Sequence, residues 1–157
     1  MLPPYDHPWK TTLRHLRNHF AIRCAQEWRL YDGFSVEIPT WFAGSEQIWF
    51  TYGYTCSIER WTATFTDHWI VIEENGQQQF IEYADIAAVD LPNLKTGPVC
   101  AFQCAGKPIE YTTTTLALYT GARVIVRGAV HNKRRDAYLW HVLTKTKYDR
   151  DRNTPLA

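Results

Sequence analysis

Between Phe34 and Arg127 the chain consists of short, aromatic-rich segments in which apolar and polar residues alternate, with turn signals between them. Alternation with a period of two indicates strands that bury one face, and closely spaced turns indicate antiparallel neighbours. The strongest turn signal is Asn75-Gly76, because both residues accept the positive φ that a two-residue hairpin requires. The sequence therefore predicts a curled antiparallel sheet.

We expect about seven strands. The segments that show the pattern are 34–38, 47–55, 58–66, 69–73, 79–83, 99–104, 109–119 and 123–127. Residues 84–89 fit either a continuation of the fifth segment or a short helical or bulged step. The predicted fold class is α+β: a curled antiparallel sheet, or partly open barrel, with an N-terminal helix and a C-terminal helix that caps it.

Helical spacing is found at both ends of the chain. In residues 9–31, apolar residues recur every three or four positions and form one stripe. The stripe consists of Leu13, Leu16, Phe20, Cys24 and Trp28. Gly33 suits the left-handed residue that ends such a helix. A second helix is expected from about residue 132 to 147, with Asn132 as its N-cap, and its Trp140 is predicted to plug the open end of the sheet.

A chain of 157 residues is expected to form one domain and to bury roughly 68–70% of its unfolded surface. We divide it into a helical extension (1–33), the sheet with its capping helix (34–147) and a polar tail (148–157). The first ten residues hold three prolines and no apolar core of a signal peptide. We therefore expect a cytoplasmic protein whose four cysteines are reduced thiols.

Charge is distributed unevenly, although the net charge is only +1. Residues 1–31 hold five basic and two acidic residues, 32–110 hold three and eleven, and 111–157 hold nine and three. The sheet region is thus acidic and both ends are basic. Such asymmetry is informative about partners rather than about the fold.

The sequence shows no established catalytic or metal-binding motif. His15 and His19, four residues apart on the first helix, could share a metal ion, but no further ligands stand near them and we assign no metal site. Cys100 and Cys104 are predicted to lie on one strand, too far apart for a disulfide. We expect no cofactor and assign no catalytic residue, and we favour a non-enzymatic role over an enzyme assembled from distant residues.

Two segments resemble bacterial pleckstrin-homology-like domains. They are FTDHWIVIEENGQQQFIEYADIAAVDLP (Phe65 to Pro92) and LYTGARVIVRGAVHNKRRDAYLWHVL (Leu118 to Leu143). The first is similar to the strand, hairpin and strand of that family, and the second to its last strand and closing helix. The resemblance implies a binding scaffold. Lipid-binding members use basic residues around the first hairpin, whereas Trp41 to Gln47 here contains none.

Three groups of residues are candidates for binding. Trp41 and Phe42 precede a turn and would be either an exposed anchor or part of the core. An acidic group on the sheet suits a basic partner, and a basic group suits an acidic surface; either could also be ordinary solvated surface. The acidic group is Glu73, Glu74, Glu82, Asp85 and Asp90. The basic group is Arg123, Arg127, Lys133, Arg134 and Arg135.

The favoured function is a non-catalytic protein-binding module, one form of which is a bacterial immunity-type inhibitor of a toxin. The first alternative is an adaptor that binds a membrane surface or lipid through the basic helices together with Trp41 and Phe42. The second is an uncharacterised enzyme or a nucleic-acid binder, which we rank lower because no nucleic-acid-binding motif is present. The sequence leaves the oligomeric state open.

Overall fold

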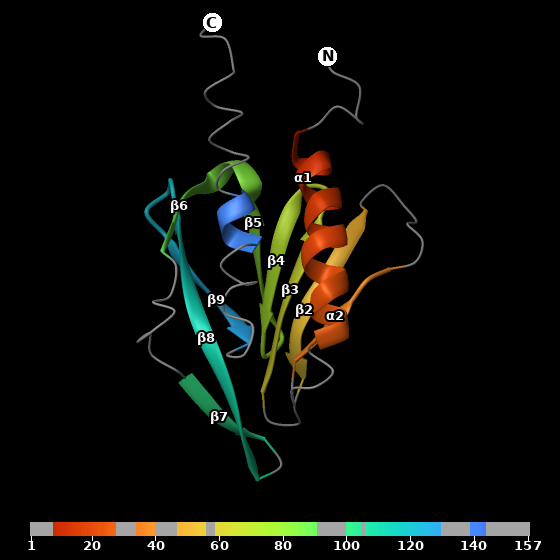
Figure 1. The fold of residues 1–157 in the computed structure, drawn as a ribbon. Helices are drawn as coiled ribbons and strands as arrows, with labels where there is room; N and C mark the ends of the chain where they lie inside the picture. The colour runs from red at the N-terminus through yellow and green to blue at the C-terminus, as the bar shows by residue number, and fades with distance from the viewer. Residues whose placement is uncertain are drawn as a thin grey trace, which may run out of the picture.

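The computed structural model describes residues 8–27, 34–39, 47–55, 59–90, 100–104, 106–129 and 139–143. Within these ranges nine strands form two antiparallel sheets (Figure 1). Sheet A runs in the order β1-β2-β3-β4-β5, and in sheet B the strand β8 pairs with β6, β7 and β9. The α+β class with antiparallel strands is confirmed.

The strands of sheet A are β1 (Phe34–Glu37), β2 (Ile48–Thr55), β3 (Arg60–Thr66), β4 (Trp69–Glu74) and β5 (Gln77–Glu82). Those of sheet B are β6 (Ile86–Asp90), β7 (Cys100–Cys104), β8 (Lys107–Leu118) and β9 (Arg123–Ala129). The N-terminal helix consists of α1 (Pro8–Leu16), a π-helical turn η2 (Arg17–Ala21) and α2 (Ile22–Glu27). Residues 139–143 are also helical.

The prediction of one curled sheet of about seven strands was wrong in two respects. The described strands form two sheets, which do not close into a barrel, and there are nine of them. The break falls at the 3-10 helix η4 (Tyr83–Asp85), after which β6 begins the second sheet. Alternation reports which face of a strand is buried, but it does not report to which sheet the strand belongs.

The β4–β5 hairpin matches its prediction. Asn75 and Gly76 have φ values of 50° and 87°, and the two strands pair without a register shift. The tip is held against β3, because the Asn75 side-chain Oδ1 accepts a hydrogen bond from the Arg60 backbone N–H at 2.9 Å, and the Asn75 N–H donates to the Arg60 carbonyl at 3.0 Å. This anchoring fixes where Glu74, the last residue of β4, projects.

The N-terminal helix covers one face of sheet A, which we call the inner face (Figure 1). Its stripe behaves as predicted: four of the five stripe residues are fully buried, and Trp28 lies outside the described residues. The four are Leu13, Leu16, Phe20 and Cys24. The ring of Phe20 meets the inner face at 5.9 Å from the centroids of both Phe50 and Tyr52.

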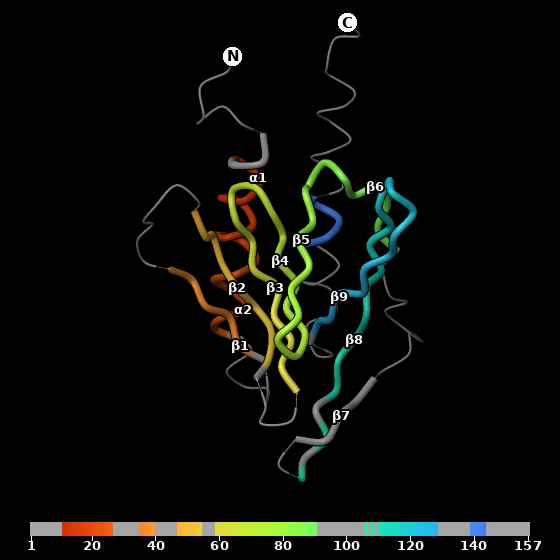
Figure 2. The backbone as a smooth tube through the Cα atoms, turned by 180° about the vertical axis from the view of Figure 1, so that it is seen from behind, coloured from red at the N-terminus to blue at the C-terminus, as the bar shows by residue number. Residues whose placement is uncertain are grey.

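The core continues between the two sheets. Trp61 and Phe65 of β3 are fully buried, and the helical residues 139–143 lie between sheet A and sheet B (Figures 1 and 2). Trp140 is 1% exposed, and its ring centroid lies 5.8 Å from that of Phe65. Trp140 packs against sheet A as predicted, but it belongs to a segment that lies between two sheets and not at the open end of one curled sheet.

Candidate functional site

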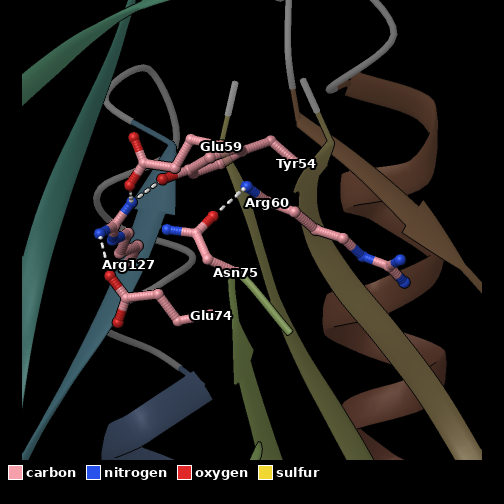
Figure 3. A network of polar contacts seen from close by, with 6 residues as sticks. All are labelled: Tyr54, Glu59, Arg60, Glu74, Asn75 and Arg127. Carbon is pink, nitrogen blue, oxygen red and sulfur yellow. Dashed lines mark hydrogen bonds and ion pairs between the residues drawn. The ribbon is translucent and has the colours of Figure 1, made fainter. Parts of the chain in front are cut away.

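The most extensive polar network in the described residues lies where the end of β9 meets the ends of β2, β3 and β4 (Figure 3). The Nη1 of Arg127 donates to the Tyr54 hydroxyl and, at 2.7 Å, to Oε1 of Glu59. Its Nη2 donates to Oε1 of Glu74, also at 2.7 Å. One guanidinium of sheet B thus binds groups from β2 and β4 of sheet A and from the residue just before β3.

Aromatic rings complete this group, which we call the Arg127 cluster (Arg127, Tyr54, Glu59, Glu74 and Tyr111). The Arg127 Cζ lies 4.5 Å from the ring centroid of Tyr111 and 5.7 Å from that of Tyr54, within the range of cation–π attraction. The Arg127 side chain is only 11% exposed. Its planar guanidinium therefore both stacks and donates, as Arg but not Lys can do.

The electrostatics of the cluster are unequal, because two carboxylates face one guanidinium. Burial raises the pKa of Glu59, and the charge of Glu74 raises it further. Burial also lowers the pKa of Arg127. These directions follow from removing charges from water. Since the guanidinium donors are directed at Glu59, Glu74 and Tyr54, the arrangement is suited to joining the two sheets rather than to turning over a substrate.

The basic group that the sequence suggested is therefore divided. Arg123 is exposed on β9, whereas Arg127 is paired and mostly buried, although both lie on the same side of that strand. The difference arises because the far end of β9 reaches sheet A. Lys133, Arg134 and Arg135 lie outside the described residues. Glu59 was not predicted from the sequence, yet its carboxylate accepts a hydrogen bond from Arg127 and helps to hold that side chain against sheet A.

The second candidate is the outer face of sheet A, the face turned away from the N-terminal helix (Figure 2). The strand register places Glu37, Thr51, Thr64, Val71 and Phe80 in one row across all five strands. Thr51, Thr64 and Val71 are half-buried between their neighbours, whereas Glu37 and Phe80 at the two ends of the row are exposed. No described element covers this row.

Apolar and acidic side chains gather toward β5 on this face. Phe80 is 57% exposed and packs edge-to-face on Trp69 at 5.9 Å between centroids. Glu82 is exposed and stands opposite Trp69. Glu73, in the next row, forms an ion pair with Arg60 at 3.7 Å, and Arg60 is the only Lys or Arg in the five strands. The outer face therefore carries more carboxylates than cations.

The acidic group that the sequence suggested does not form one site. Glu73 lies on the outer face, whereas Glu74 points to Arg127, as expected for consecutive strand residues. Glu82 shares the outer face with Glu73. Asp85 lies in η4, between the two sheets in the chain, and Asp90 ends β6, a strand of sheet B. Trp41 and Phe42 lie outside the described residues.

The candidate metal ligands lie close together on the first helix. The rings of His15 and His19 lie 4.4 Å apart between centroids on the exposed side of the N-terminal helix. In the part of the chain that the structure describes, no group of three or more His, Cys, Asp or Glu side chains could hold a metal ion. Cys24 is buried and its thiol is not in a disulfide, consistent with a packing role. Cys100 and Cys104 begin and end β7, which agrees with the predicted strand.

Comparison with known proteins gives no relative: no protein-family model, no curated protein and no solved structure matches this chain. Across the described ranges, none of the helices combines the length and apolar character that crossing a membrane requires.

Proposed function

We propose that this protein is a non-catalytic protein-binding module that docks a positively charged partner on the outer face of sheet A. The observation that carries the proposal is the composition of that face. Phe80 offers an apolar contact, and Glu37 and Glu82 stand exposed at opposite edges of the sheet. The only cation of the five strands, Arg60, is already close to Glu73.

Such a surface has the parts of a protein interface. Aromatic side chains supply most of the contact energy at the centre of an interface, while charged residues at its rim steer the partner and set its orientation. Here Phe80 and Trp69 would form the centre and the carboxylates the rim. Stability does not require these residues to be apolar, because the outer face is not part of the core, so their exposure favours a role in binding.

An immunity-type inhibitor of a bacterial toxin is one specific form of this module, because an acidic face can occupy the basic surface of an enzyme. We also propose that the fold is related to the pleckstrin-homology-like domains. The features that support this relation are two antiparallel sheets and the helical residues 139–143 between them, which include the buried Trp140. A fold of this kind is a scaffold, and its function depends on the surface it presents.

The test compares two variants with matched exposure. In the first, Phe80→Ser is combined with Glu37→Lys and Glu82→Lys on the outer face of sheet A. In the second, Ile125→Ser, which removes a side chain that is 58% exposed against 57% for Phe80, is made on sheet B. Tagged wild type and both variants are used to capture partners from extract of the source cells, and the captured protein is then purified and titrated against each.

We expect the first variant to lose capture and at least tenfold in affinity, about 1.4 kcal/mol, while the second binds like wild type. Wild-type affinity should also fall as salt rises, because exposed charges are screened. Equal binding by wild type and the first variant would contradict the proposal.

A membrane-surface adaptor is the second candidate, and one observation favours it. The exposed side of the N-terminal helix carries Arg14 and Arg23 with the exposed Ile22 between them, and it lies on the opposite side of sheet A from the acidic face (Figures 1 and 2). Basic side chains near an anionic bilayer each contribute about 1 kcal/mol. Sedimentation with anionic vesicles should be lost in Arg14→Glu with Arg23→Glu; no sedimentation of wild type at low salt would remove this candidate.

A further inference from the structure

No described element covers the outer face of sheet B from Ile125 to β6, and its chemistry differs from that of sheet A. At the other end of this face Arg127, on the same side of β9 as Ile125, is held by Glu59 and Glu74. Two large apolar side chains are exposed on the uncovered part or at its border: Ile125 of β9 at 58% and Tyr119, just after β8, at 64%. Between them the strands present small residues, with Ala88 exposed and Ala117 half-buried. A flat face of small side chains allows another sheet to approach to about 10 Å.

Two opposite charges stand on this face without a partner. Arg123 on β9 and Asp90 on β6 are both exposed, and no ion pair involves either side chain within the described residues. The register puts Arg123 level with Ala117 of β8, and Asp90 level with Thr115. They are separated by two strand spacings, about 10 Å, and by two residues along the strands, about 7 Å, and they form no ion pair with each other.

We propose that a second copy of this chain docks face to face on the outer face of sheet B, about a twofold axis that runs along β8. This rotation places β9 of each copy over β6 of the other copy. The Arg123 of each copy then lies over the partner's Ala88, which is small enough to admit it, and within reach of the partner's Asp90. The interface is isologous, so it closes at two copies and forms both ion pairs at once.

The charge pattern selects both the partner and the axis. A twofold axis across the strands would place each copy's β9 against the partner's β9 and bring Arg123 toward the partner's Arg123. The outer face of sheet A is less suited to pairing with itself, because its three carboxylates, Glu37, Glu73 and Glu82, outnumber its one cation, Arg60. Sheet A therefore suits a foreign partner, and sheet B suits another copy.

The dimer should be weak and dependent on concentration. Three strands contribute to the face, and interfaces below about 1,200 Å² belong to transient complexes. The first measurement is therefore the mass of the purified chain by sedimentation equilibrium from about 10 μM to about 1 mM, the range in which such weak interfaces saturate. We expect the average mass to rise from one chain toward two.

A charge exchange tests the pairing itself. Arg123→Glu alone opposes two carboxylates across the interface, and Asp90→Arg alone opposes two guanidinium groups, so each should shift the dissociation constant upward at least tenfold. The double variant restores opposite charges and should dimerise like wild type. Glu82→Lys on the outer face of sheet A is the control and should leave dimerisation unchanged.

All four variants alter exposed side chains, so their circular dichroism should match that of wild type. The proposal is overturned if wild type stays monomeric throughout the range, if the double variant fails to recover, or if Glu82→Lys disrupts the dimer as strongly as Arg123→Glu. None of these outcomes bears on the docking of a foreign partner on sheet A, which uses a different face.

Discussion

The two faces of sheet A are made by the same five strands, yet they differ in almost every property. Inward, Tyr52, Trp61 and Phe65 are buried under the N-terminal helix and sheet B. Outward, the same strands present threonines, carboxylates and the exposed Phe80. Burial of the inner face stabilises the fold, and this requirement restricts the residues that can stand there to apolar ones. The outer face is not needed for the core, so its composition is better evidence of function.

The largest expected effect on stability is that of replacing Trp140, which lies behind the inner face. Trp140→Ala removes a 1% exposed ring from the space between the sheets, and we expect the free energy of unfolding to fall by about 3–5 kcal/mol, the range for a large aromatic side chain lost from a core. Urea unfolding followed by circular dichroism measures this loss. A loss below 1 kcal/mol would mean that the layer between the sheets does not hold them together.

The Arg127 cluster tests whether polar contacts contribute to the same junction. Arg127→Met keeps an apolar stem beside Tyr111 but leaves Glu59 without its cation. We expect a loss of about 2–3 kcal/mol, somewhat below the value for a fully buried pair, because Glu74 is 54% exposed. Arg60→Met breaks the exposed pair with Glu73 and is the control, with an expected loss of about 0–1 kcal/mol. Equal losses in the two variants would place Arg127 at the surface.

Substitutions on the outer face should lower the free energy of unfolding much less. Phe80→Ser gives up an edge-to-face contact with Trp69 while leaving the core intact, so we expect a loss of about 0.5–1 kcal/mol. Phe65→Ser, two strands away but facing inward, should cost several times more. Comparable thermal stability of the two variants would show that the faces are not distinct.

Local features of this fold could be predicted from the sequence because their causes are local. The Asn75-Gly76 turn, the apolar stripe of the N-terminal helix and the burial of Trp140 each follow from a few neighbouring residues. The division into two sheets could not be predicted, because the same turn signals precede a strand that joins the same sheet and a strand that begins another sheet. Gly53 within β2 marks a close approach of two strands: its φ is 153°, and a Cβ there would lie 2.1 Å from the Trp61 carbonyl oxygen.

The Arg127 cluster was beyond sequence reasoning for a different reason. Arg127 is 68 residues from Glu59 and 53 from Glu74, so only the packing of the two sheets brings them together. From the sequence, Arg127 was indistinguishable from the exposed Arg123. The outer face was partly predictable, since alternation placed Glu73 and Glu74 on opposite sides, but their partners Arg60 and Arg127 depend on tertiary structure.

The smallest expected effect is a pH dependence within the Arg127 cluster. Because burial and then Glu74 raise the pKa of Glu59, the folded state favours the protonated carboxyl more than the unfolded state does. The stability that this provides is present below the unfolded pKa and is lost as pH rises through the folded pKa. Glu59→Gln keeps an acceptor for Arg127 but cannot titrate. The unfolding free energy of wild type, taken relative to Glu59→Gln, should therefore be greatest at low pH and decline as pH rises from the ordinary pKa of a glutamate through the raised pKa of Glu59. If the stability of wild type relative to Glu59→Gln instead grows with rising pH, the ion pair between Glu59 and Arg127 outweighs the burial of Glu59 and its repulsion from Glu74.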